Sequence, residues 1–436
     1  MAASTPPSRV AIVGTGHRAQ LFTAALASRP RYDVVALCDP SPTRMAFHNA
    51  LLADHGRPPA RTWAPDDFGT MLLTAAPALV VVTSTDATHD AYIVAALRAG
   101  ARVITEKAMT TDAAKARRIM QAVRDTGGDL KVAFNYRFNP VHAKVHELLR
   151  GGAVGEVISV HFEWLLDVRH GADYFRRWHR YREHSGGLTV HKASHHFDLV
   201  NWWLGARPRT VFGRGRLAFY GANGKRNGYA RDYVRAHGSP AAQDDPFAIQ
   251  LADNPSLRAL YLDAEADSGY VRDQNVFGDG ITIEDDMALL VEYDSGASMT
   301  YHLTAYSPWE GYRVMVNGSR GRLELEVEEA AWTRPAQRVE SARGSVHGDL
   351  AADTAGGARI LVRPLWQPPQ EVRVAAFDHA GHGGGDQRML AALLDDAPEQ
   401  ADDRATAEDG LLALLPGLAA NESFRTGRPV DVATLL

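Results

Sequence analysis

Side chains that could move a proton fall in two short stretches of this sequence. The first stretch ends in Lys107, which follows the apolar run Arg102-Val103-Ile104-Thr105 and Glu106 directly. A lysine held near a substrate hydroxyl can accept or donate its proton when burial lowers the lysine pKa. The alternative is a surface lysine after a strand, but its position at the carboxyl end of a buried strand favours the chemical role.

The second stretch is His191-Lys192-Ala193-Ser194-His195-His196-Phe197-Asp198, which follows a glycine pair. On one continuous helix, His191 and His195 would share a face, and Asp198 could orient the His195 ring. A single histidine is more often a satisfied core residue, yet three histidines beside a lysine favour proton transfer. Zinc is the competing interpretation of His-x-x-x-His. No Glu follows His191, so we expect no metal.

A basic and aromatic segment, residues 174–182, precedes the glycine pair. Planar guanidinium groups suit carboxylate, sulfonate or phosphate, and aromatic faces suit sugar rings, whereas the alternative is a solvated basic loop. The residues expected to bind substrate are Arg137, Arg176, Trp178, Arg180, Tyr181, His191, Lys192 and His196. Near the C-terminus, His382 and Asp386 are further polar candidates, although a helix cap explains Asp386 equally well.

A glycine turn near the N-terminus is the element that should position these groups. Val10 to Val13 predict a buried strand, and Gly14, Gly16 and Ala19 complete the pattern G-x-G-x-x-A before a helix. The first glycine permits a tight turn, the second lets backbone approach a pyrophosphate, and the small third residue lets the helix pack on the strand. The pattern therefore predicts a dinucleotide at the start of this helix.

A second strand, 34–38, ends in Asp39, which lies 23 residues after Gly16. That spacing suits the acid that holds the adenine ribose hydroxyls. Arg44 lies one turn into the next helix and could meet a 2′-phosphate. Because Asp39 is present, we expect NAD rather than NADP.

Strands alternate with helices as far as residue 134, which predicts an α/β, doubly wound parallel sheet with ligands at the carboxyl ends of its strands. The residues expected to bind the cofactor are Gly14, Thr15, Gly16, His17, Arg18, Asp39, Ser84, Thr85, His89, Glu106, Lys107 and Tyr136.

The chain should divide into a Rossmann domain, 1–135, and an α+β substrate domain, 136–436, because strand patterns at 157–164, 287–293, 298–305, 313–317 and 322–327 follow the parallel sheet. A polar stretch at 213–280, rich in Gly, Asp and Asn, predicts an insertion that lies over the site. The glycine pair should open one helix that ends at Gly205.

Composition excludes several classes of protein. The chain has 436 residues and a net charge of -5, which argues against nucleic acid as a partner. Cys38 is the single cysteine, so no intrachain disulfide can form, as suits the cytoplasm. We identify no signal peptide and no apolar run long enough to span a bilayer.

Together these motifs resemble the Gfo/Idh/MocA oxidoreductase family. The resemblance rests on the glycine turn, Cys38-Asp39-Pro40, the Thr-x-x-x-His from Thr85 to His89, Ala-Gly-x-x-Val-x-x-Glu-Lys ending at Lys107, and Asn135-Tyr136-Arg137-Phe138-Asn139-Pro140. It implies an open, mostly antiparallel second sheet, often used for homo-oligomerisation, and proton transfer by Lys107. It also implies that His195 points at the substrate. Ala108 replaces the family's proline. The family aspartate four residues before the histidine is replaced by His191, followed by Lys192, and either could transfer the proton.

The leading interpretation is an NAD(P)-dependent enzyme that transfers a hydride between its cofactor and a ring hydroxyl carbon of a sugar, which the arginines suggest is anionic. A redox-neutral, NAD-dependent glycosidase, which some relatives exemplify, is the near alternative. A non-catalytic sensor of NAD and a sugar is the third.

Overall fold

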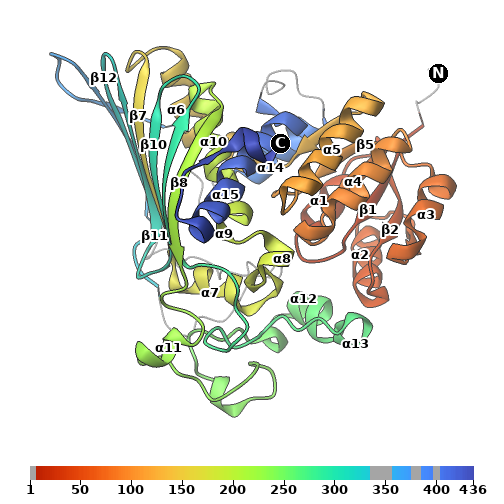
Figure 1. Cartoon of the computed structure of the whole chain (residues 1–436). Helices are drawn as coiled ribbons and strands as arrows, with labels where there is room; N and C mark the ends of the chain where they lie inside the picture. The colour runs from red at the N-terminus through yellow and green to blue at the C-terminus, as the bar shows by residue number, and fades with distance from the viewer. Residues whose placement is uncertain (1–5, 334–355, 375–383, 396–402) are drawn as a thin grey trace. The chain divides into compact units, whose positions relative to one another are not determined.

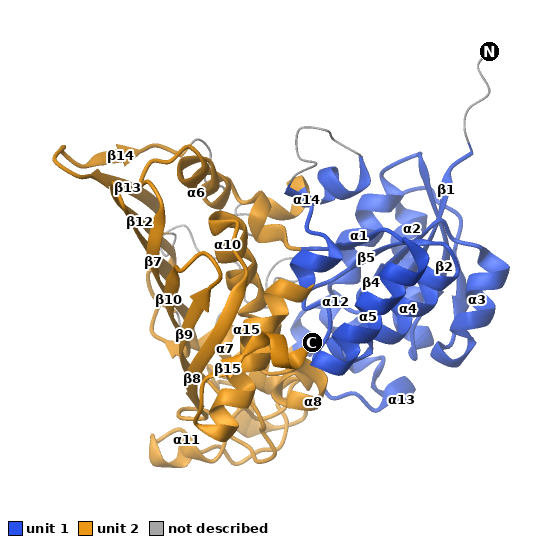
Figure 2. Cartoon of the chain, turned by 45° about the horizontal axis from the view of Figure 1, so that its top comes forward, with its two compact units in different colours: residues 1–133, 251–271, 389–410 blue, residues 134–250, 272–388, 411–436 orange. Residues whose placement is uncertain are grey.

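The computed structural model describes residues 6–333, 356–374, 384–395 and 403–436 of the chain (Figure 1). These residues form two compact units. Unit 1 comprises 1–133, 251–271 and 389–410, and unit 2 comprises 134–250, 272–388 and 411–436 (Figure 2). In the described part of the chain no helix is both long and apolar enough to cross a membrane.

Unit 1 contains a parallel sheet in the strand order β3-β2-β1-β4-β5-β6. Its strands are β1 (Ser8–Val13), β2 (Tyr32–Cys38), β3 (Arg61–Trp63), β4 (Leu79–Val82), β5 (Arg102–Thr105) and β6 (Leu130–Val132). The helices that connect them are α1 (Ala19–Ala27), α2 (Pro42–Asp54), α3 (Phe68–Ala75), α4 (His89–Arg98) and α5 (Ala113–Thr126). This order is that of a dinucleotide-binding Rossmann fold, and it confirms the predicted doubly wound sheet.

Unit 2 contains a nine-stranded sheet in the order β14-β13-β12-β11-β7-β10-β9-β8-β15, in which only β10 and β7 pair in parallel among the described strands. The strands are β7 (Val157–Asp167), β8 (Pro208–Arg216), β9 (Asp286–Tyr293), β10 (Ser298–Ser307), β11 (Glu310–Gly318), β12 (Gly321–Ala330), β13 (Ala358–Pro364), β14 (Gln370–Val372) and β15 (Val430–Asp431). The mostly antiparallel sheet expected from the resemblance is therefore present.

Helices lie on one face of this sheet, as both views of α6, α10 and α15 show (Figures 1 and 2). The helices of unit 2 are α6 (Pro140–Arg150), α7 (Val168–Arg176), α8 (Arg182–Ser185), α9 (Leu188–His191), α10 (Ser194–Leu204), α11 (Asn223–Arg226) and α15 (Ala407–Thr426), the last beginning in unit 1. Along β9 buried and exposed residues alternate, so one face packs on the core and the other is open in the single chain.

The boundaries differ from those expected in two places. Residues 251–271 and 389–410 belong to unit 1 although the sequence placed them in the second domain. The predicted insertion, 213–280, begins within β8. Gly213 and Gly215 resemble loop residues, but they lie in this strand because side chains pack against them: a Cβ on Gly215 would lie 2.5 Å from the Phe424 ring.

Candidate functional site

The glycine turn of unit 1 has the geometry that a dinucleotide needs. Gly14 has φ of +83°, and a Cβ there would lie 2.4 Å from the backbone of Ser84, so no other residue fits. A Cβ on Gly16 would meet nothing within 4 Å, so its backbone is open to close approach. The turn is fixed by the hydrogen bond from Gly14 N to the Cys38 carbonyl, 2.8 Å.

Asp39 lies beside this turn at the end of β2. Its carboxylate accepts from Thr15 N at 2.7 Å and from Ser41 N at 2.8 Å, and the side chain is buried. The buried Thr15 hydroxyl has no hydrogen-bond partner among the residues that the structure describes. Glycine turn, buried acid and unpartnered hydroxyl thus fit a dinucleotide with its ribose at Asp39 and its pyrophosphate at the start of α1.

Glu106 organises the approach to Lys107. Its carboxylate pairs with Arg18 at 2.5 Å and accepts from Lys107 N at 3.2 Å. The Lys107–Ala108 peptide bond is cis, and the Lys107 side chain is half-buried. Glu106 therefore orients the lysine and Arg18, which is a more specific role than the cofactor contact expected of it.

His89 is completely buried in unit 1, and its two ring nitrogens lie 3.1 Å from the Ser84 carbonyl and 2.9 Å from the Ala108 carbonyl. Burial lowers the pKa of this histidine, while its hydrogen bonds to the Ser84 and Ala108 carbonyls act in the opposite direction. It joins the end of β4 to the loop after β5. We had expected a cofactor contact, but the geometry makes His89 a positioning residue for Lys107. At the same strand end, the Thr88 hydroxyl lies 2.8 Å from both the Ser84 hydroxyl and the Thr85 carbonyl, so it can donate to the carbonyl and accept from Ser84.

A second group of proton-carrying side chains lies in unit 2. Lys192 Nζ donates to the Tyr136 hydroxyl at 2.9 Å and lies 4.7 Å from the centre of the Trp164 ring. The His195 ring stacks on Tyr136 with centroids 4.2 Å apart. Burial lowers the pKa of Lys192, while Glu310 and Glu329 act in the opposite direction. Burial also raises the pKa of Tyr136, so burial disfavours the charged form of both partners.

His191 and His195 do not share a helix, contrary to expectation. α9 ends at His191 and α10 begins at Ser194. Ala193 N donates to the Leu188 carbonyl at 2.8 Å, five residues back, and the Thr189 carbonyl faces α15 instead, where a Cβ on Gly417 would lie 2.3 Å from it. Contact with a distant helix thus interrupts the predicted one.

The break directs His191 toward the aromatic segment. Its ring centroid lies 4.1 Å from that of His179, 5.7 Å from Tyr174 and 5.9 Å from Trp178. Trp178 in turn stacks on His179 at 3.6 Å. His191 and Trp178 are therefore close together, as the substrate-binding prediction requires.

Three predicted substrate ligands are structural in this fold. Arg137 forms a buried pair with Asp198 at 2.8 and 2.6 Å, so Asp198 serves that arginine rather than only orienting His195. His196 is completely buried, stacks on Trp164 and pairs with the Tyr301 hydroxyl at 2.7 Å. Arg180 is buried and donates to the carbonyls of Asn275 and Asp279. Residue type suggested ligand binding, but packing directs these side chains into the protein.

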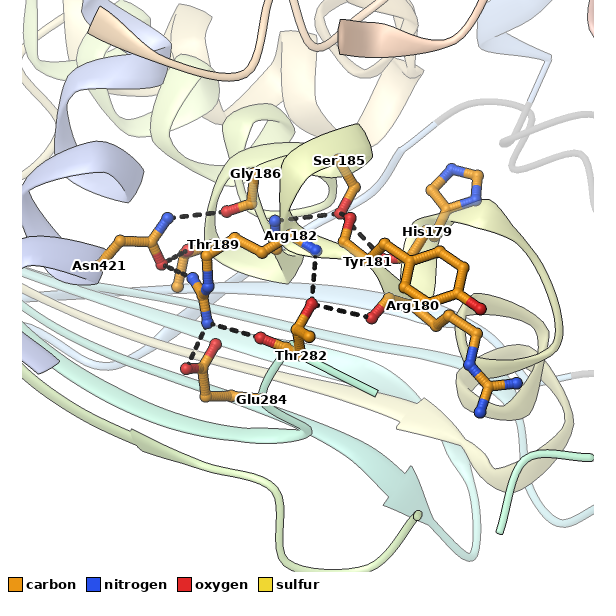
Figure 3. A network of polar contacts seen from close by, with 11 residues as sticks. His179, Arg180, Tyr181, Arg182, Ser185, Gly186, Thr189, Thr282, Glu284 and Asn421 are labelled. Carbon is orange, nitrogen blue, oxygen red and sulfur yellow. Dashed lines mark hydrogen bonds and ion pairs between the residues drawn. The ribbon is translucent and has the colours of Figure 1, made fainter. Parts of the chain in front are cut away.

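A polar network fixes the glycine pair that precedes His191 (Figure 3). Arg182 pairs with Glu284 at 2.5 Å and donates to Asn421 at 2.6 Å. Asn421 also accepts from the Thr189 hydroxyl and donates to the Gly186 carbonyl, at 3.0 and 2.7 Å. Arg182 thus links the end of the aromatic segment to α15, while Tyr181 donates to Gln274 at 3.3 Å.

The aromatic segment also carries an excess of positive charge around Asp173, which is completely buried. Its carboxylate lies 2.5 Å from Arg272, 3.1 Å from Arg177 and 3.8 Å from Arg176. Burial lowers the pKa of Arg176 to about 10. Three guanidinium groups thus gather around one buried carboxylate.

Asp173→Asn should destabilise the protein by about 3 kcal/mol, because it leaves buried cations without their counter-charge. Thermal and urea unfolding of the full chain, followed by tryptophan fluorescence, measures the change. Asp232→Asn, at an exposed position of unit 2, is the matched control and should have little effect. An equal response of the two variants would show that Asp173 does not hold the arginines together.

Two further candidates need comment. Among the described residues, no group of three or more His, Cys, Asp or Glu side chains could hold a metal ion. Asp386 accepts from Asn135 Nδ2 at 2.8 Å, within unit 2. His382 lies outside the described residues.

Two family models match this chain. Residues 8–134 match the NAD-binding Rossmann fold of the Gfo/Idh/MocA oxidoreductase family, and residues 146–432 match its C-terminal alpha/beta domain. The chain therefore belongs to this family, as its motifs had suggested.

Relatives agree with that assignment. The protein YteT of Bacillus subtilis (strain 168), named as an oxidoreductase, is 33% identical over 418 residues, which cover 93% of this chain and 92% of YteT. An inositol 2-dehydrogenase of Rhizobium meliloti (strain 1021) is 34% identical over 134 residues, 31% of this chain and 38% of that enzyme. The structure of a levoglucosan dehydrogenase in complex with NADH and levoglucosan has a TM-score of 0.65 at 15% identity, covering 98% of this chain and 99% of that chain. At this identity the likeness concerns the fold.

Sequence reasoning missed two features of the site. Trp164 packs against Lys192, but in the sequence it is an apolar residue of an alternating strand, which predicts only a core position. Residues 251–271 join unit 1, yet their elements are too short to give a periodic pattern. Leu257, Leu260 and Tyr261, which are buried in the structure, are the residues that could have signalled a packed segment.

Proposed function

We propose that this protein oxidises a secondary hydroxyl of a sugar or sugar derivative with NAD as hydride acceptor. The observation that carries the proposal is the Lys192–Tyr136 hydrogen bond beside the stacked His195 ring, in a chain whose other unit has an NAD-binding fold. A buried lysine with lowered pKa, a phenol and an imidazole form a proton-handling group rather than an inert core. The sugar-like substrates named for two relatives support the choice of substrate class.

In this reaction the substrate loses a hydride from carbon and a proton from oxygen, and a C=O bond forms. NAD⁺, when bound at the glycine turn, supplies the hydride acceptor. Lys107 Nζ accepts the hydroxyl proton, and Glu106 orients the lysine through its backbone N–H. His195 donates a hydrogen bond to the substrate. Lys192 takes the place of the family aspartate, because it contacts Tyr136 beside His195, whereas His191 contacts the rings of residues 174–179.

An anionic sugar is the finer form of the proposal. The three guanidinium groups around Asp173 exceed its single charge, and the Arg177 side chain remains 20% exposed. A carboxylate on the substrate would offset that excess.

Substrate pairs that differ only in this charge test the class. Glucose with glucuronate, and galactose with galacturonate, should be incubated with NAD⁺ while NADH absorbance is followed. We expect the uronate of one pair to have a kcat/KM about tenfold or more above its neutral partner, as one charge-assisted hydrogen bond contributes about 1.5 kcal/mol or more. Equal rates would leave a neutral sugar as substrate, and no NADH formation with any sugar or polyol would contradict the dehydrogenase. Mass spectrometry of molecules released on denaturation identifies the bound nucleotide independently.

A redox-neutral glycosidase is the second candidate, because unit 2 has proton carriers beyond Lys107. Such a cycle oxidises the sugar, eliminates the aglycone, adds water and reduces the ketone again, so it needs an additional acid or base. Lys192 and His195 could supply one. Release of nitrophenol from nitrophenyl glycosides without added NAD⁺ would favour this cycle over net oxidation.

We also infer a homo-oligomer that pairs through the large sheet of unit 2. The face away from the helices exposes Leu290 of β9, 43%, which a partner subunit would cover.

A further inference from the structure

The segment 251–271, part of the stretch expected as an insertion, packs within unit 1. It contains η6 (Leu251–Asp253), α12 (Pro255–Leu257), the π-helical turn η7 (Arg258–Leu262) and α13 (Glu265–Ser268). It shares the colour of unit 1 in Figure 2, where α12 and α13 are labelled. Its contacts concentrate on three parts of the predicted nucleotide site, which are the glycine turn, the loop after Asp39, and the start of α2.

At the glycine turn, the contact is made by Tyr261. Its hydroxyl accepts a hydrogen bond from His17 N at 3.3 Å, and the side chain is buried. The N–H groups that follow Gly16 are the donors that a pyrophosphate would use. Tyr261 therefore lies where the phosphates are expected, on an element outside the Rossmann core.

Arg44, in the first turn of α2, binds to the same segment. The guanidinium donates through Nε to the Leu260 carbonyl at 3.0 Å and lies over the rings of Tyr261 and Tyr270, 5.9 and 5.6 Å from their centres. It is also 3.7 Å from Asp39. Arg44, which the sequence suggested as a ligand of a 2′-phosphate, thus points toward the segment and Asp39.

In the loop after Asp39, the contact is made by the carboxylate of Asp267. Asp267 Oδ2 accepts from the Ser41 hydroxyl at 2.6 Å and from Thr43 N at 3.1 Å. The hydrogen bond from Ser41, and then that from Thr43, lowers the pKa of Asp267, so it is charged at neutral pH. The Ser41 hydroxyl and the Thr43 N–H, at the start of α2 and next to the ribose acid, are donors that a 2′-phosphate would require, and here both donate to Asp267.

We propose that the segment 251–271 is part of the coenzyme site, and that Asp267 makes the protein selective for NAD by occupying the anion position that the 2′-phosphate of NADP would take. The segment thus adds a second carboxylate to the one supplied by Asp39. A phosphate brought to Ser41 would have to displace Asp267 and would meet its negative charge. The inference rests on nucleotide binding by unit 1, which is part of the proposed function.

Binding of the reduced coenzymes tests this without any catalysis. Protein freed of co-purifying nucleotide is titrated with NADH and with NADPH, and the fluorescence of the nicotinamide is followed. Wild type should bind NADH much more tightly than NADPH. Asp267→Asn should lower the Kd for NADPH by about tenfold and change that for NADH little, since removing one nearby charge is worth about 1 kcal/mol or more. Tyr261→Phe should raise the Kd for both coenzymes by about threefold or more, through the loss of one hydrogen-bonding group.

Asp263→Asn is the matched control. Asp263 is an exposed acid of the same segment that pairs with Arg258 at 3.6 Å, so the variant changes net charge equally without touching Ser41. Equal NADPH affinity in Asp267→Asn and wild type, the same gain in Asp263→Asn, or comparable binding of both coenzymes by wild type would overturn the inference. Thermal midpoints establish that each variant is folded. Binding of neither coenzyme by wild type would overturn the proposed function, and this inference with it.

Discussion

Lys107→Met should lower kcat by about 10³- to 10⁴-fold, the upper range for the loss of a general acid or base, while NADH still binds. Methionine retains the length of the side chain but cannot accept a proton. The surroundings of Lys107 should persist, because Glu106 holds its backbone N–H and His89 holds the Ala108 carbonyl, and neither contact uses the lysine side chain. Steady-state oxidation of the best sugar substrate, together with NADH titration, measures both effects.

Chemical rescue separates proton transfer from a loss of packing. Added methylamine should restore part of the activity of Lys107→Ala, since a small amine can occupy the position of the missing ammonium group. Lys115→Met is the control in the same unit: Lys115, in the first turn of α5, pairs with Asp112 at 3.3 Å. If Lys107→Met and wild type turned over equally, the lysine would not be the base. If neither had activity with any sugar, the sensor interpretation would gain support.

The parallel sheet could be predicted because its strands lie between two layers of helices. Val10–Val13 and Leu79–Val82 are buried on both faces and therefore appear as short apolar runs, each followed by a polar strand end. Asp39 and Lys107 lie at the corresponding ends of the neighbouring strands β2 and β5, as expected. Local sequence was sufficient here because the position of a ligand in such a sheet follows from strand direction alone.

The histidine stretch could not be predicted in the same way. The break between α9 and α10 depends on Gly417, more than 200 residues away, whose backbone faces the Thr189 carbonyl. Likewise, His196 and Arg137 have the residue types of ligands, but Tyr301 and Asp198 bind them within unit 2. Long-range packing decides such orientations, and helical spacing carries no information about it.

Residues 251–271 show a third limit. Their short elements, among them a three-residue helix at Pro255–Leu257, give no periodicity from which a packed surface could be inferred. Their place in unit 1 depends on the individual contacts of Tyr261 and Asp267. The sequence predicted an insertion over the site, but it could not tell which residues reach the nucleotide loops.

Lys192→Met should have two opposite effects, with activity falling by about 10²- to 10³-fold and stability rising by about 1 kcal/mol or more. Lys192 is buried, 3% exposed, against Trp164 and Tyr136, and burial lowers its pKa, so its charge is unfavourable in the folded protein. Methionine fills similar volume without that charge. A residue retained at a cost in stability is expected at a functional position.

The stability gain should depend on pH in a direction that follows from linkage. Because the folded pKa of Lys192 lies below its ordinary value of 10.5, the unfolded chain binds more protons between those two values. The cost of burying the charge is full below the lowered pKa and disappears as pH rises toward 10.5. The thermal midpoint of Lys192→Met should thus exceed that of wild type most at neutral or lower pH, and the difference should shrink in alkaline buffer.

Two comparisons make this result specific to Lys192. Lys144→Met removes a partly exposed lysine of α6 that pairs with the exposed Glu147 at 2.6 Å, and it should leave both activity and midpoint nearly unchanged. Tyr136→Phe removes the partner hydroxyl and should lower activity less than Lys192→Met, because the amine remains. A Lys192→Met protein that is less stable than wild type at neutral pH would show that the ammonium group is well compensated in the fold. If the Lys192→Met protein kept full activity, Lys192 would not have the role of the family aspartate. His191, which stands at the position of that aspartate, would then be the remaining candidate.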